Sequence, residues 1–147
     1  MFKTHVAAGF LAGIFLMQYF SPASQLLFIS LVLIGAILPD IDHPKSKIGR
    51  NFKIVSLFFE HRGFFHSLLV LPVIAFLLLY FTKTSYYSLP LIIGYLSHLV
   101  TDAVTKEGIM PFHPLSRARI SGFIRTGGFF EYVIFFAIAA FAVIKLI

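Results

Sequence analysis

The stretch Leu38-Pro39-Asp40-Ile41-Asp42-His43-Pro44 decides how the rest of the chain is interpreted. It puts two carboxylates and one imidazole within residues 40–43, directly after an apolar run long enough to cross a membrane. Acids and histidines are scarce here, with six of each in 147 residues. Carboxylate oxygens and imidazole nitrogens together suit a divalent metal such as zinc, manganese or iron. The alternative is a plain turn at the membrane exit, in which proline stops helices and aspartate caps the next one.

The composition is that of a membrane protein. Hydrophobic residues make up 59% of the chain and charged residues only 12%, whereas about a quarter of a soluble domain is charged. The length predicts a single membrane domain, residues 1–147, and no internal repeat is present. Lys and Arg outnumber acids by 12 to 6, as expected for cytoplasmic loops that face anionic headgroups. Because these basic residues are dispersed, we expect no nucleic-acid binding.

Apolar segments alternate with short polar loops. This pattern predicts an all-α, polytopic membrane helix bundle of four or five spans. In the 40–63 loop, apolar residues at helical spacing over 51–60 predict a short interfacial helix. The first apolar segment could instead be a signal peptide, because small residues suited to cleavage follow it. The expected spans are about 5–20, 23–39, 64–81, 86–104 and 128–147.

The distribution of charge predicts the orientation. With five spans, the amino terminus and the loops 40–63 and 105–127 share one side, and that side holds most of the Lys and Arg residues. We therefore expect an inner-membrane protein with its amino terminus in the cytoplasm and its carboxyl terminus outside. All six histidines and all six acids also fall on the cytoplasmic side. The positive-inside rule does not require this, since acids and histidines contribute little to it.

The spacing of these polar residues favours one shared site. His98 and Asp102 are four residues apart and therefore lie on one face of a helix, as two ligands of one metal should. An unpaired ionisable group in a membrane span is costly, so a shared cation is the simplest partner for both. A direct hydrogen bond between them is the alternative. His61 and His66 are five apart, and Gly63 between them suggests that His61 precedes the third span while His66 lies in its first turn.

We expect the metal ligands to come from six residues and the catalytic groups from three more. His61 is a candidate general acid or base, and the forked donors of Arg62 suit a phosphate oxygen. A haem site is disfavoured, because haem iron does not use an aspartate cluster. The expected ligands are His5, Asp42, His43, His66, His98 and Asp102, and the expected catalytic residues are His61, Arg62 and Asp40.

Four ordered motifs run through the chain: Thr4-His5, Leu38-Pro39-Asp40-Ile41-Asp42-His43, His61-Arg62-Gly63-x-x-His66-Ser67 and Gly94-x-x-x-His98-x-x-x-Asp102, followed by Gly108 and Pro111. From residue 4 to about 115 this set resembles the YdjM-type family, and the resemblance implies a LexA-regulated, inner-membrane, metal-dependent hydrolase. The order of ligands is also similar to that of the zinc-dependent phospholipase C and single-strand nuclease enzymes. This chain has no Trp and lacks their later His-x3-Asp/Glu pair, so we expect one or two ions instead of three.

The expected function is metal-dependent hydrolysis of a phosphoester at the cytoplasmic membrane surface. A bound divalent metal, zinc first and manganese or iron as alternatives, would lower the pKa of a bound water and polarise the scissile group. Membrane lipid, including a phospholipid substrate, is the expected partner. Two alternatives stay open: a non-enzymatic protein with a structural or regulatory site, and a divalent-metal transporter, although the middles of the spans lack ionisable residues. Nothing in the sequence indicates the oligomeric state.

Overall fold

The computed structural model describes residues 1–43, 46, 49–51 and 62–147, and every regular element in this part of the chain is a helix. The all-α expectation is therefore confirmed. Three short 3-10 helices accompany the α-helices: η1 (Leu38–Asp42), η2 (Gly49–Asn51) and η3 (Phe64–His66). The α-helices are α1 (Phe2–Phe20), α2 (Gln25–Ile37), α4 (Val70–Thr82), α5 (Ser88–Ala103) and α6 (Phe129–Leu146).

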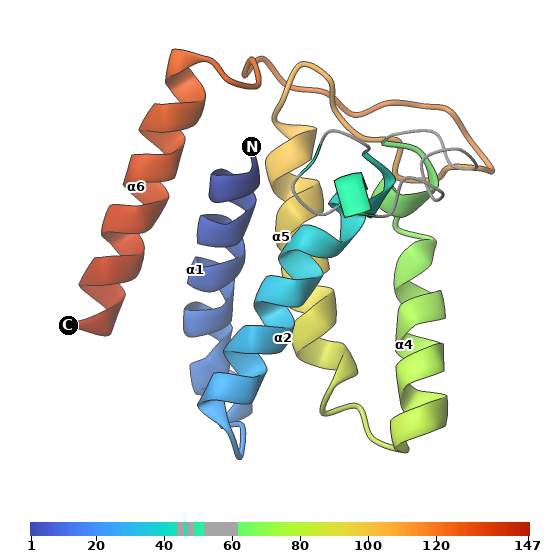
Figure 1. Ribbon diagram of the computed structural model, residues 1–147, viewed down its shortest axis with the longest axis vertical. Helices are drawn as coiled ribbons and strands as arrows, with labels where there is room; N and C mark the ends of the chain where they lie inside the picture. Colours follow the sequence, from blue (N-terminus) through green and yellow to red (C-terminus); the bar gives the residue numbers. More distant parts are fainter. Residues whose placement is uncertain (44–45, 47–48, 52–61) are drawn as a thin grey trace.

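Helices α1, α2 and α5 pack against one another and form the centre of the bundle (Figure 1). Glycines allow their backbones to approach closely, which is the usual way for apolar helices to associate in a membrane. A Cβ atom at Gly94 would lie 1.8 Å from the carbonyl oxygen of Val32, and one at Gly35 would lie 2.1 Å from that of Leu91. Between α2 and α5, these glycines are therefore required by the packing itself.

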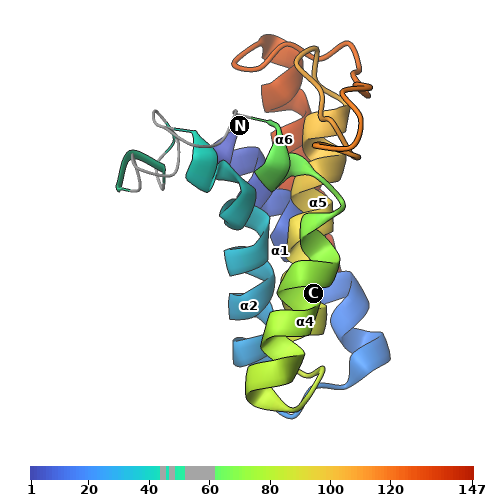
Figure 2. The same ribbon diagram turned by 90° about the vertical axis from the view of Figure 1, so that its right-hand side faces the viewer.

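Helices α4 and α6 lie at the periphery. Helix α4 packs on α5, as Figure 2 shows from the side, while α6 packs on α1 and stands at the edge of the bundle. A hydrogen bond of 3.0 Å from the Thr4 hydroxyl to Glu131 ties the start of α6 to α1. The amino group of Met1 also lies 3.5 Å from the Glu131 carboxylate. The start of α1, the end of α5 and the start of α6 consequently share one end of the molecule.

Among the described residues, two segments are long and apolar enough to cross a membrane: Gln25–Asp42, which comprises α2 and η1, and Phe129–Leu146, which is α6. Only 6% of the α6 segment is buried inside the protein, so its apolar side chains face outward on most sides. Helix α4 is apolar but has only 13 residues. The count of four or five spans stays a prediction.

The start of the third predicted span differs from expectation. Helix α4 begins at Val70, and His66 ends the separate turn η3, so the placement of His66 in the first turn of the span was wrong. The reason is a tertiary contact. Both the backbone N–H of Leu68 (2.9 Å) and the hydroxyl of Ser67 (3.0 Å) donate to the carbonyl of Pro111, which holds this segment out of helical geometry. Of the interfacial helix predicted over 51–60, residue 51 ends η2 and the rest lies outside the described part of the chain.

Candidate metal centre

Three histidines and one aspartate from three separate segments meet at the end of the bundle where α1 begins and α5 ends. His5 comes from the first turns of α1, His66 from η3, and His98 and Asp102 from the last turns of α5. Their relative exposures are 3%, 0%, 0% and 1%. Because burying an ionisable group without a partner is costly, this cluster must be held together by protons or by a cation.

Three of the donor atoms have the spacing of ligands around one ion. His66 Nε2 lies 3.3 Å from His98 Nε2 and 3.3 Å from Asp102 Oδ2. His98 Nε2 lies 3.6 Å from the same carboxylate oxygen. Ligand atoms about 2.1 Å from a tetrahedral ion lie about 3.4 Å from one another. The three distances therefore match the edges of such a coordination shell.

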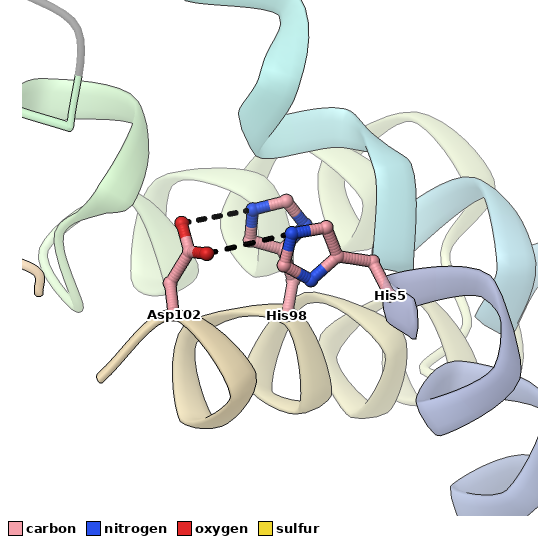
Figure 3. Close-up of side chains that lie close together, drawn as sticks. All are labelled: His5, His98 and Asp102. Carbon is pink, nitrogen blue, oxygen red and sulfur yellow. Dashed lines mark ion pairs between the residues drawn. The ribbon is translucent and has the colours of Figure 1, made fainter. Parts of the chain in front are cut away.

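His5 adds a third nitrogen, which lies near the other oxygen of the carboxylate. Its ring stacks on that of His98, with centroids 3.8 Å apart and an interplanar angle of 16°. His5 Nε2 lies 3.4 Å from Asp102 Oδ1, and Figure 3 shows both rings turned toward the aspartate. His5, His98 and Asp102 thus form a buried group able to hold a metal ion.

The outer nitrogens of His5 and His98 are held by oxygen acceptors. His98 Nδ1 lies 2.7 Å from the carbonyl oxygen of Ala36, which can only accept. His5 Nδ1 lies 2.6 Å from the Thr101 hydroxyl, whose own hydrogen is directed to backbone carbonyls of α5. Each neutral ring therefore carries its proton on Nδ1 and presents the Nε2 lone pair to Asp102. This is the arrangement found around metal-binding histidines, whose second nitrogen is oriented by an acceptor.

Asp42 orients the ring of His66 through Nδ1, as Ala36 and Thr101 orient the rings of His98 and His5. The Asp42 carboxylate is fully buried and lies 3.3 Å from His66 Nδ1, so it faces the nitrogen that points away from Asp102. Burial alone would lower the pKa of His66, but hydrogen bonding to Asp102 and Asp42 outweighs it and raises that pKa to about 9. His66 lies in η3, outside α4. Two carboxylates thus favour a positive charge at this ring, supplied by a proton or by a metal.

Arg62 clamps the cluster from the other side. One terminal amino group lies 3.1 Å from Asp102 Oδ1 and 3.3 Å from the Glu107 carboxylate. The other donates to the Thr105 hydroxyl (3.0 Å) and to the carbonyl of Gly108 (3.1 Å). Arg62 is 8% exposed, and its backbone has a positive φ of 61°, which residues other than glycine rarely adopt. Both ends of its fork are therefore engaged with the protein.

Of the remaining predicted residues, Asp40 lies at the margin of this cluster. Asp40 is half-buried, and a carboxylate oxygen of it falls within 4.8 Å of nitrogen atoms of both His66 and His98. His43 caps η1 and belongs to neither of the two metal-competent groups that the described residues form. His61 lies outside the described residues. Sequence reasoning missed Thr101 and Thr105, because a hydroxyl that orients another side chain has no characteristic spacing.

The fold and the site define a class: an all-helical membrane protein with a buried His/Asp group able to bind a metal. The chain belongs to the YdjM inner membrane protein family, whose family model matches residues 1–146. An inner-membrane location fits that family name and the two apolar segments.

The chain is similar to proteins from three bacteria. It is 36% identical over 137 residues to YvsG of Bacillus subtilis (strain 168), covering 90% of this chain and 85% of that protein. It is 39% identical over 88 residues to the inner membrane protein YdjM of Escherichia coli (strain K12) and to that of Shigella flexneri. That match covers 52% of this chain and 44% of each relative, so it spans less than half of their length. No solved structure matches the chain.

Proposed function

We propose that this protein is an integral membrane metal-dependent hydrolase that acts on a phosphoester at the cytoplasmic membrane surface. One observation carries the proposal: the Nε2 atoms of three buried histidines, each oriented through its Nδ1, face a single carboxylate. A merely hydrogen-bonded core does not need several imidazole lone pairs directed at one point. The ligands we assign are His5, His66, His98 and Asp102.

The donor set fits the proposed metal. Nitrogen and carboxylate oxygen without thiolate suit zinc, and manganese or iron are the alternatives. One or two ions are proposed, because the described residues form two overlapping groups that share His98. When bound, the ion would lower the pKa of a water and polarise the scissile bond.

The protein's own residues would orient the ligands and move protons. Thr101 and Asp42 orient histidine rings, and Arg62 fixes Asp102, a role we assign to it in place of phosphate binding because its fork is already engaged. Asp40 is the acid at the margin that is not fully buried, and we propose that it accepts the proton of the attacking water. His43 and His61 remain predicted site residues.

The proposed number of four or five spans rests on the apolar segments of the sequence. The proposed orientation, with the amino terminus and the site in the cytoplasm, rests on the distribution of Lys and Arg. The proposed phosphoester substrate rests on the same basic loops, which would attract an anionic group.

The second candidate function is a structural metal site, and the burial of the histidine ligands favours it. His66 and His98 are completely buried, whereas a catalytic site keeps one coordination position open to substrate. In that case the ion would join η3 to the end of α5 and stabilise the bundle without any reaction.

Metal analysis and activity assays on the protein purified in detergent separate these functions. We expect bound zinc, and cleavage of a phosphodiester that stops on chelation and returns with zinc. His98→Ala should lose both, while His113→Ala, which removes a histidine outside the cluster, should keep both. Metal bound without any hydrolysis would favour the structural site. Full activity in a metal-free preparation would overturn the hydrolase proposal.

A further inference from the structure

The segment 104–128, here called the connecting loop, joins α5 to α6 without helix yet has a defined backbone. Ile109 and Ile120 exchange two backbone hydrogen bonds of 2.9 Å, and the N–H of Gly122 donates to the carbonyl of Thr105 at 2.8 Å. The side chains of Ile109 and Ile124 are buried and anchor the loop to the bundle. The loop therefore holds its other side chains in fixed positions.

Several of those side chains are large, apolar and exposed. Leu115 is 82% exposed and Phe123 80%, with Ile120 at 55% and Phe112 at 52%. A soluble protein rarely holds so much apolar surface in water without a partner. Arg117 and Arg119 lie between these apolar residues in the sequence and Arg125 follows them, and all three are exposed.

The position of the connecting loop shows which partner this surface fits. Helix α6, an apolar segment long enough to span a membrane, begins at Phe129, directly after the loop. The other such segment, Gln25–Asp42, ends at the same end of the bundle, and the loop crosses that end (Figures 1 and 2). The loop thus lies at the depth where a membrane meets water, where apolar side chains enter the leaflet and cations contact headgroups.

We propose that the connecting loop docks on the anionic surface of the leaflet, with Leu115 and Phe123 inserted among the lipids and Arg117 and Arg125 on lipid phosphates. In the part of the chain that the structure describes, neither arginine forms an ion pair with an acidic side chain, so both charges are available. Arg119 is instead engaged with the backbone carbonyl of Glu107 at 2.7 Å. A soluble anion would use the arginines but not the apolar tips, which is why the leaflet is the better match.

Docking would also act on the metal centre, because the connecting loop provides the oxygens that hold Arg62 and Ser67. These oxygens belong to Thr105, Gly108 and Pro111. The leaflet would then keep the loop in the conformation that supports the cluster. The docking proposal itself does not depend on a bound metal or on hydrolysis.

The absence of Trp from the chain makes a clean test possible. Phe123→Trp and, separately, Leu115→Trp each introduce a single fluorescent reporter into protein reconstituted in vesicles that contain phosphatidylglycerol. We expect lipids brominated near the headgroup to reduce its emission roughly twofold, and aqueous acrylamide to quench it much less than free tryptophan. Ready quenching of both reporters by acrylamide would overturn the proposal. Protection from lipid and acrylamide alike would indicate a protein partner and would also overturn it.

A charge-matched pair of variants tests the role of the arginines. In the Phe123→Trp background, Arg117→Gln with Arg125→Gln should reduce bromolipid quenching in anionic vesicles to the level seen in neutral ones. Lys83→Gln with Lys145→Gln removes two charges at the opposite end of the bundle and should leave the quenching unchanged. Equal effects of the two double variants would refute a specific contact between the loop and anionic lipid.

Discussion

Arg62 and Asp102 are separated by 40 positions in the chain, yet the Arg62 guanidinium lies 3.1 Å from Asp102 Oδ1. This contact occupies one carboxylate oxygen and leaves Oδ2 between the Nε2 atoms of His66 and His98. A carboxylate gripped on one oxygen by a buried cation cannot rotate freely. The orientation of Asp102 toward two histidines is therefore a consequence of Arg62.

Arg62→Lys should weaken metal binding without abolishing it. Lysine keeps the charge but has no fork, so it cannot reach Asp102, Thr105 and Gly108 at once. Loss of such an orienting contact typically lowers metal affinity about 10- to 100-fold. Competition with a chromophoric chelator measures this change. Arg117→Lys, at an exposed position, should bind metal as the unaltered protein does.

Asp42→Asn and Asp102→Asn should have different effects on metal binding. Asp42 faces His66 Nδ1, so its replacement should leave metal bound with about 10- to 100-fold lower affinity. Asp102 faces three Nε2 atoms, and its replacement should abolish stoichiometric binding. Metal content after dialysis distinguishes the two. If Asp42→Asn lost all metal while Asp102→Asn kept it, our assignment of their roles would be reversed.

Asp40→Asn should separate metal binding from catalysis. Asp40 is the half-buried acid of the cluster, and the amide cannot take a proton from water. We expect kcat to fall about 100-fold, within the range typical of a lost general base, while zinc content stays the same. Loss of zinc from this variant would show that Asp40 is a ligand.

Metal binding should strengthen as the pH rises. The pKa of His66 is raised from 6.5 to about 9, so below pH 9 a metal must displace a proton from this ring. Between pH 6.5 and 8.5 the apparent affinity should rise about tenfold per pH unit for each proton released. His66→Gln should flatten this slope, and an equally steep slope in that variant would place the proton elsewhere.

The stability of the metal-free protein should decrease as the pH rises. A raised pKa contributes stability that is complete below pH 6.5 and is lost as the pH rises through 9. Thermal unfolding of chelator-treated protein in detergent should therefore occur at a lower temperature at pH 9.5 than at pH 6.5. Added zinc should remove most of that difference at the higher pH.

Gly94→Ala should destabilise the bundle by about 1–3 kcal/mol or more, the usual cost of overpacking. The new Cβ would lie 1.8 Å from the carbonyl oxygen of Val32, and two backbones would have to separate. Gly127→Ala is a useful comparison, because nothing lies within 4 Å of the new methyl group there. Its cost should be only the strain of a positive φ of 77°, roughly 1–2 kcal/mol. Thermal unfolding in detergent compares the two variants.

Much of this protein could be predicted without coordinates, because the relevant physics is local. Long apolar segments between polar loops predicted an all-helical chain, and a spacing of four residues predicted that His98 and Asp102 would lie together. Within one helix, covalent geometry and 3.6 residues per turn determine which side chains meet. The relative positions of side chains within one helix therefore do not depend on what that helix packs against.

Contacts between distant segments could not be predicted in the same way. Nothing in the order of residues indicated that Asp42 would face the outer nitrogen of His66, or that Arg62 would hold Asp102. The helix start near His66 was predicted wrongly because Ser67 and Leu68, just before α4, donate hydrogen bonds to the Pro111 carbonyl. Such contacts depend on how closely α2 and α5 approach at Gly35 and Gly94, and that distance is set by the fit of complete surfaces.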